Sequence, residues 1–130
     1  MAPTFNALSI VVADMGKALA FYRRLGLDIP PSADSEPHAE VNVGGTRLMW
    51  DTYETIRSFD PDFTPPSGTQ GIALAFECAD PAEVDSTYAD LVQAGYESHK
   101  EPWDAFWGQR YAVMRDPDGN TVDLYAALPQ

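Results

Sequence analysis

The sequence predicts an α+β fold in which one structural unit occurs twice. Each half of the 130-residue chain begins with a β-branched strand pattern, continues with a helix and ends in further strands. Three pairs of like residues are each 66 positions apart: Asp14 and Asp80, Tyr22 and Tyr88, and Leu25 and Leu91. A repeat near half the chain length indicates a duplicated module. We therefore expect a single domain over residues 1–130, with repeats at about 4–53 and 69–127.

The first half opens with a strand over residues 5–12, in which the larger apolar side chains alternate with others. Asp14 provides an N-cap for a helix that begins at Met15, and Gly26 ends this helix as a C-cap. A loop rich in proline and polar residues follows over 30–37. The segments 38–43 and 46–52 then form a hairpin around the turn Gly44–Gly45.

Residues 53–70 are rich in proline and aromatic side chains and lack a clear period, which predicts a connector. The second half repeats the order of the first. A strand over 71–78 precedes a helical segment over 82–95. Asp80 is expected to cap this helix, with Pro81 at its first position. The remaining elements are a short strand at 96–100, a loop to residue 106, strands over 107–116 and 120–128, and a turn at Pro117–Gly119 between these two strands.

Composition narrows the function classes. The formal net charge is −12, so the surface repels phosphate backbones and anionic lipid, and we expect no nucleic-acid or membrane partner. A high acidic balance also attracts cationic ligands, or simply keeps the protein soluble. Cys78 is the one cysteine, which excludes an internal disulfide and is typical of a cytoplasmic protein. No signal-peptide pattern is seen at the start.

Four segments resemble the vicinal oxygen chelate superfamily, the glyoxalase and bleomycin-resistance group. They are VVADMGKALAFYRRLGL, VGGTRLMW, ADPAEVDSTYADLVQAG and WGQRYAVMRDPDGNTVDLY, in this order over nearly the whole chain. The resemblance implies two βαβββ modules whose curved mixed sheets enclose a cleft, with the helices outside. It also implies a homodimer, because dimers are common in the family.

Enzymes of this family hold a divalent metal with side chains at four strand positions. The resemblance aligns these positions with Ala7, Met49, Ala73 and Asp123. Alanine has no donor atom and methionine is a soft ligand, so three of the four ligands are missing and no metal cofactor is expected. His38 and His99 lie at unrelated spacing, and we interpret both as ordinary histidines.

The expected ligand site has a small-residue floor and aromatic walls. Alternation turns Ala7, Ser9, Ala73 and Ala75 away from the apolar face, which leaves room for a ligand. Aromatic rings stack on planar or cationic compounds, and the candidates are Trp50, Tyr53, Phe59, Phe63, Trp103 and Trp107, with Met49 beside them. The alternative for Trp50 and Trp107 is packing in the core or in a dimer interface. Arg110 is expected to stack on an aromatic ring or to pair with Asp123.

These observations favour a metal-independent protein that binds a small planar or cationic molecule, similar to the antibiotic-binding members of the family, with Asp123 supplying charge. One alternative is a metal-dependent lyase, isomerase or dioxygenase that uses Glu77, Asp123 and a histidine. Acid–base catalysis by Asp123 or Glu77 without a metal is another. The last alternative is a dimeric scaffold without a ligand.

Overall fold

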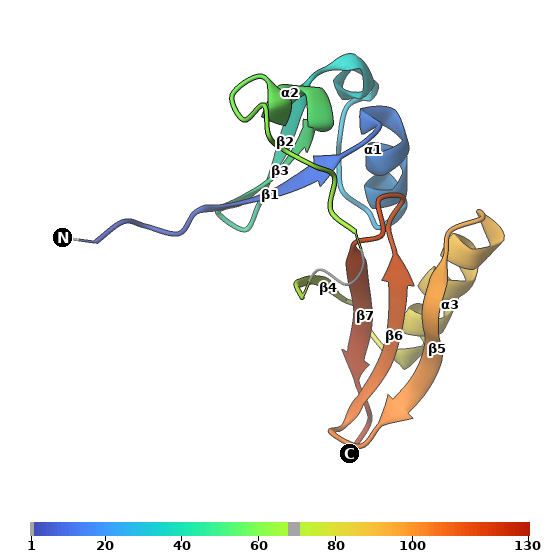
Figure 1. Ribbon diagram of the computed structural model, residues 1–130. Coiled ribbons are helices and arrows are strands. Elements are labelled where there is room, and N and C mark those ends of the chain that lie inside the picture. The colour runs from blue at the N-terminus through green and yellow to red at the C-terminus, as the bar shows by residue number, and fades with distance from the viewer. Residues whose placement is uncertain (1, 68–70) are drawn as a thin grey trace. The chain divides into compact units, whose positions relative to one another are not determined.

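The computed structural model describes residues 2–67 and 71–130. The chain divides into two compact units, Met1–Pro65 and Pro66–Gln130. Each unit is a βαβββ-like module with one mixed sheet, which confirms the predicted α+β fold (Figure 1). That the two sheets enclose a cleft stays a prediction. Among the described residues, no helix has the length and apolar character needed to cross a membrane.

The first unit forms a three-stranded sheet in the order β1-β3-β2, with β1 parallel and β2 antiparallel to the central β3. Its elements are β1 (Ala7–Val12), α1 (Met15–Arg24), the 3₁₀ helix η1 (Pro31–Ser35), β2 (His38–Val43), β3 (Thr46–Thr52) and α2 (Tyr53–Arg57). The hairpin β2–β3 has the predicted bounds, and Gly44 and Gly45 both take the positive φ of a tight turn.

Helix α1 covers one face of this sheet. Asp14 caps it by accepting a hydrogen bond from the Lys17 backbone N–H at 2.9 Å, and Gly26 follows its end with a φ of 95°. The fully buried Tyr22 and Trp50 rings lie 5.4 Å apart between α1 and β3. Burial of two such large rings supplies much of the apolar area of this small core.

The second unit forms a four-stranded sheet in the order β4-β7-β6-β5, which we call the second sheet. Its elements are β4 (Ala73–Glu77), α3 (Pro81–Gln93), β5 (Ser98–Ala105), β6 (Gln109–Arg115) and β7 (Thr121–Ala127). Strands β4 and β7 are parallel, and the other neighbours are antiparallel. The predicted start of the second repeat, residue 69, lies outside the described residues.

Helix α3 packs on one face of the second sheet (Figure 1). Asp80 caps α3 by accepting from the Glu83 backbone N–H at 2.9 Å, while the Glu83 carboxylate accepts from the Ala79 N–H at 2.9 Å. Val84 and Leu91 of the helix are fully buried. They face the buried side chains of β6 and β7, which are Ala112, Met114, Val122, Leu124 and Ala126.

Three elements differ from the sequence prediction. β5 continues to Ala105 through residues predicted as a loop, because a bulge keeps the chain extended there. In the first unit, η1 occupies the segment between helix and hairpin where the second unit has β5, so the first sheet has one strand fewer. The short helix α2 replaces the start of the predicted connector, where Thr52 caps it by accepting from the Thr55 N–H at 3.2 Å.

The turn between β6 and β7 is organised by a buried carboxylate. Asp116, 4% exposed, accepts hydrogen bonds from the backbone N–H groups of Asp118 and Asn120 at 2.9 and 2.8 Å. Gly119 takes the predicted positive φ. The acceptor role of Asp116 was not predicted from the sequence.

Candidate functional site

The face of the second sheet opposite α3 collects the chemically distinctive side chains of the second unit. Because side chains alternate along a strand, the burial of Val122 and Leu124 against α3 turns Asp123 and Tyr125 to the opposite face. We call this the open face. Its residues on β6 follow from the register, which pairs Tyr111 with Tyr125 across the two strands.

A bulge in β5 adds two more side chains to the open face. Lys100 pairs in register with Val113 and Trp103 with Tyr111, so three residues of β5 span the distance that two residues of β6 cover. The extra residue lets both Lys100 and Trp103 point to the same face. Pro102 lies inside this bulge, where the missing N–H costs no ladder hydrogen bond.

The resulting aromatic cluster consists of Trp103, Trp107, Tyr111 and Tyr125. The Tyr111 ring lies 5.5 Å from both indole rings, and the indoles lie 6.0 Å apart at 89°. Tyr125 stacks against Tyr111 at 6.2 Å. These are the favoured distances for aromatic pairs, so the cluster holds its rings in fixed orientations.

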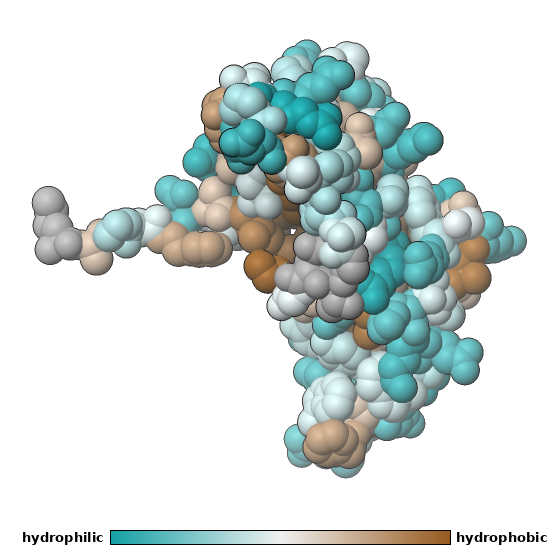
Figure 2. Space-filling view, in the orientation of Figure 1, coloured by the Kyte–Doolittle hydropathy of each residue, from teal (hydrophilic) through white to brown (hydrophobic). Residues whose placement is uncertain are grey.

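Part of this cluster is accessible. Trp107 is 49% exposed, and its indole N–H donates to the Gln109 side-chain oxygen at 2.8 Å. The neighbouring Phe106, on the turn between β5 and β6, is 97% exposed. Figure 2 shows a mostly hydrophilic surface. A small hydrophobic area lies at the end of the second unit where the turn between β5 and β6 is found.

Asp123 is the acidic member of the open face. Its carboxylate accepts a short hydrogen bond from the Tyr111 hydroxyl. Burial, followed by the bond to Asp123, raises the pKa of Tyr111 to about 12, so the phenol stays protonated at neutral pH and keeps donating. The other carboxylate oxygen of Asp123 accepts no hydrogen bond from the side chains that the structure describes, and it can accept one from a ligand.

Small side chains flank Asp123 on β4. Ala75 is its register partner, and Ala75 and Ala73 are both exposed. Glu77 shares this face, is exposed, and pairs in register with Tyr125. The structure thus connects Trp103 and Trp107 to Asp123 through Tyr111, with the exposed alanines of β4 beside the carboxylate. It adds Tyr111 and Tyr125, which the alternation in β6 and β7 could have revealed.

The prediction that Trp50 offers a stacking surface is wrong. Trp50 is fully buried on the helix-facing side of β3, because the neighbouring Met49 and Asp51 occupy the other side. Its indole N–H is buried without a hydrogen-bond acceptor within the described part of the chain. The alternative interpretation, packing in the core, is correct.

The remaining candidates of the first half lie in the first unit. Ring centroids of Tyr53 and Phe63 are 5.5 Å apart, and the Arg57 guanidinium lies 5.8 Å from each. Tyr53 also lines a hollow of about 480 Å³ between α1, η1 and α2. Phe59 is 72% exposed after α2. Ala7 is partly buried and pairs in register with Arg47.

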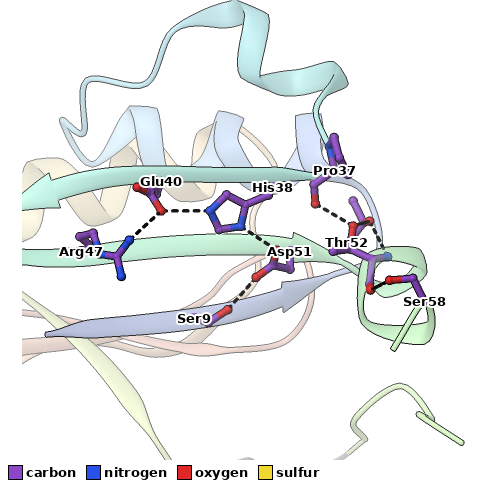
Figure 3. Close-up of polar contacts among 9 residues, drawn as sticks. Ser9, Pro37, His38, Glu40, Arg47, Asp51, Thr52 and Ser58 are labelled. Carbon is purple, nitrogen blue, oxygen red and sulfur yellow. Dashed lines mark hydrogen bonds and ion pairs between the residues drawn. The ribbon is translucent and has the colours of Figure 1, made fainter. Parts of the chain in front are cut away.

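In the first unit, the face of the sheet opposite α1 carries a row of polar side chains joined by hydrogen bonds, instead of aromatic rings (Figure 3). Ser9 donates to Asp51 at 3.0 Å, and the two nitrogens of His38 contact Asp51 at 2.7 Å and Glu40 at 3.0 Å. Arg47 lies 3.5 Å from Glu40 at the far end. Period-two alternation in the hairpin could have revealed this row.

Both carboxylates favour the charged form of His38. The hydrogen bond to Glu40, followed by that to Asp51, raises the pKa of His38, and the same histidine lowers the pKa of Glu40. When it is protonated, His38 can donate from both ring nitrogens and link β2 to β3. His38 is thus a surface histidine, 42% exposed, with a structural role in the sheet.

The four positions that hold a metal in the family's enzymes do not fit one here. Ala7 and Ala73 carry no donor, and the Met49 thioether is a poor ligand for a hard cation. Within residues 2–67 and 71–130, no group of three or more histidine, cysteine or acidic side chains is placed to hold a metal.

Arg110 does not take either of its predicted partners. It lies on the α3 side of the second sheet, where it donates to Asp85 of the helix and to Asp104 of β5, both at 3.0 Å. Because side chains alternate along β6, Arg110 lies on the same face as the buried Ala112 and points away from Asp123. Arg110 is therefore a structural ion-pair residue.

Comparisons with known proteins agree with this architecture. A family model described as "Glyoxalase/Bleomycin resistance protein/Dioxygenase superfamily" matches residues 4–124. The uncharacterized protein YraH of Bacillus subtilis (strain 168) is 29% identical over 126 residues, which cover 93% of this chain and 96% of YraH.

Two crystal structures of similar proteins share the fold. One is a glyoxalase/bleomycin resistance protein/dioxygenase family enzyme from Burkholderia phytofirmans PsJN, with a TM-score of 0.83, 21% identity, and coverage of 97% of this chain and 100% of that one. The other is a glyoxalase/bleomycin resistance protein/dioxygenase from Nocardioides, with a TM-score of 0.74 and 26% identity. The match covers 98% of this chain and 85% of that one.

Proposed function

Because the chain belongs to the glyoxalase/bleomycin resistance protein/dioxygenase superfamily, we propose that it binds a small planar, cationic organic molecule on the open face of the second sheet. One observation carries this proposal. Trp103 and Trp107 both contact the Tyr111 ring, and the Tyr111 hydroxyl donates to Asp123, so flat rings and a carboxylate lie on one face of the sheet. Such a combination is selective for a ring that carries a positive charge.

The charge of the protein supports a cationic ligand. A net charge of −12 raises the local concentration of small cations and disfavours anions. The exposed alanines of β4 leave room beside Asp123 for the ligand. Binding in this form needs no metal, in line with the missing donors at three family positions.

Isothermal titration calorimetry tests the proposal with one ring system in three charge states. Tryptamine is cationic, N-acetyltryptamine neutral and indole-3-acetate anionic; bleomycin, mitomycin and the planar cation proflavine extend the range. We expect tryptamine to bind more tightly than the other two indoles. Equal affinity for all three indoles, or no heat with any compound, contradicts the proposal.

Variants locate the binding face. Asp123→Asn should weaken tryptamine binding about fivefold, because one charge contact is lost. Trp103→Leu should weaken it about fivefold to tenfold. Asp85→Asn is the matched control, since it removes the same charge on the α3 side of the sheet. If all three variants bind alike, the ligand does not use the open face.

The alternative is a metal-dependent lyase, isomerase or dioxygenase. It is favoured by the position of Glu77 and Asp123 on the same face of neighbouring parallel strands. Elemental analysis of protein purified without chelator distinguishes the two. A stoichiometric metal that disappears in the Glu77→Ala, Asp123→Ala double variant would favour the metal-dependent alternative and contradict metal-independent binding.

We also propose that the protein works as a cytoplasmic homodimer. Phe5 and Ile72 are large apolar side chains with 79% and 67% exposure, which a second copy could cover. Light scattering on eluting protein measures the mass directly, and a monomer at every concentration contradicts the dimer.

A further inference from the structure

Lys100 is placed where a cationic ligand of the aromatic cluster would sit. Its ammonium nitrogen lies 4.4 Å from the centroid of the Trp103 ring, within the range of an attractive cation–π contact. The bulge in β5 brings the two residues to the same face, so the contact is a product of the strand irregularity.

Among the described residues of the second unit, Lys100 forms no ion pair. No acidic side chain of residues 66–67 and 71–130 lies within 4.0 Å of its ammonium group. Asp104, on the α3 side of the same strand, pairs with Arg110 at 3.0 Å. The Trp103 ring is thus the principal partner of the ammonium group.

The surrounding rings make this position a good receptor for a cation. Trp107 and Tyr111 contact Trp103 at steep angles, 89° and 68°, and hold its indole in place. Lys100 is exposed and its side chain has many rotamers, so a ligand can displace it from the partly buried Trp103 ring at small cost.

We propose that Lys100 occupies the cation position of the aromatic cluster in the free protein, and that the ligand replaces it with an alkylammonium group of its own. This inference rests on the proposed function and narrows the ligand to an aromatic compound with an ammonium group on a flexible arm. Lys100 then competes with the ligand and disfavours neutral rings. A neutral ring displaces the Lys100 ammonium group from Trp103 but makes no cation–π contact in its place.

Nuclear magnetic resonance observes the displacement directly. The sequence contains two lysines, Lys17 and Lys100, so protein labelled with carbon-13 at lysine Cε gives two signals, and Lys17 on α1 serves as the internal reference. In the free protein we expect the Lys100 Cε protons upfield of those of Lys17, because they lie over an aromatic ring. The shift should disappear in Trp103→Leu.

Tryptamine at saturation should move the Lys100 signal to the position of the Lys17 signal, whereas N-acetyltryptamine should displace it only at much higher concentration. Coincident lysine signals in the free protein overturn the inference. So does a Lys100 signal that stays upfield when calorimetry shows tryptamine bound; in that case binding stands and displacement is wrong. An upfield Lys100 signal without binding of any compound overturns the proposed function and, with it, the role of Lys100.

Calorimetry with three variants measures the competition. Lys100→Met keeps the aliphatic chain and removes the charge, so we expect tryptamine to bind about twofold to fivefold more tightly. Lys100→Arg keeps a cation that can stack and should bind like wild type. Lys17→Met, which removes the same charge elsewhere, should also leave the affinity unchanged. Weaker or unchanged binding in Lys100→Met overturns the inference.

Discussion

His38 lies between two carboxylates, and its protonation links two strands of the first sheet. The imidazolium donates to Asp51 and Glu40, and both bonds raise the pKa of His38 above its ordinary value of 6.5. A group with a raised pKa in the folded state stabilises it fully below the unfolded pKa, and this contribution is lost as the pH rises through the folded value.

We therefore predict that His38→Gln lowers the melting temperature most at mildly acidic pH and hardly at all at alkaline pH. At the acidic end, the pKa of Glu40 is lowered in the folded state. The contribution of Glu40 to stability is therefore present above pH 4.5 and is lost as the pH falls through the lowered pKa of Glu40. The largest difference in melting temperature between wild type and His38→Gln should lie between pH 4.5 and 6.5. Thermal melts across this range measure it.

Ser9→Ala is the control for this prediction. It removes a hydrogen bond to Asp51 without removing a titratable group, so its effect should not vary in the same way with pH. A difference between wild type and His38→Gln that is constant from pH 4.5 to alkaline pH would contradict the bridging role.

At the scale of elements, both long helices begin as predicted because a capping aspartate is a local signal. Asp14 and Asp80 each accept from the N–H three residues ahead, so the offset in the sequence corresponds to a repeated structural role. The buried positions do not repeat as well. Tyr22 is fully buried, whereas Tyr88 is partly exposed and contacts the Ser98 hydroxyl at 2.6 Å.

Asp80→Ala should lower the free energy of unfolding by about 1 kcal/mol, because the first turn of α3 loses an acceptor. Asp80→Asn keeps an acceptor at the cap and should lose much less. Urea denaturation of both variants measures the difference. Equal losses in the two variants would show that charge rather than the capping bond stabilises this end.

The elements that the sequence did not reveal share a physical cause. In β5 the bulge breaks the period-two pattern, so Trp103 was predicted in a loop although it lies in a strand. The five-residue helices η1 and α2 are too short for a helical period to show. Irregular strands and single-turn helices depend on tertiary contacts that no local pattern encodes.

At the scale of the whole molecule, self-repulsion follows from 20 acidic against 8 basic side chains. We predict that raising NaCl from about 20 to about 300 mM, which shortens the Debye length to roughly 6 Å, increases the melting temperature by a few degrees. The same change should weaken tryptamine binding. Scanning calorimetry in NaCl and KCl measures the first effect, and a melting temperature that falls with salt would contradict it.

The fold was predictable from the whole sequence, whereas the site was predictable only in part. The strand period was sufficient to place Ala73 and Ala75 on the face opposite the buried residues, whereas Asp123 was proposed from the family resemblance. That a ligand binds at these residues stays a prediction. The strand period did not decide between core and surface for Trp50, because that depends on which face α1 covers. Similarly, the partner of Arg110 depends on the packing of α3, which a strand pattern does not contain.

Pro102 has a consequence for how copies of this protein avoid one another. β5 is the last strand of its sheet, and a long regular strand in that position invites the backbone of another chain to add to it. A residue without an N–H, set in an irregular stretch, interrupts the row of donors that such an addition would need. The irregularity that aims Trp103 thus also makes this edge a poor template for fibre-like self-assembly.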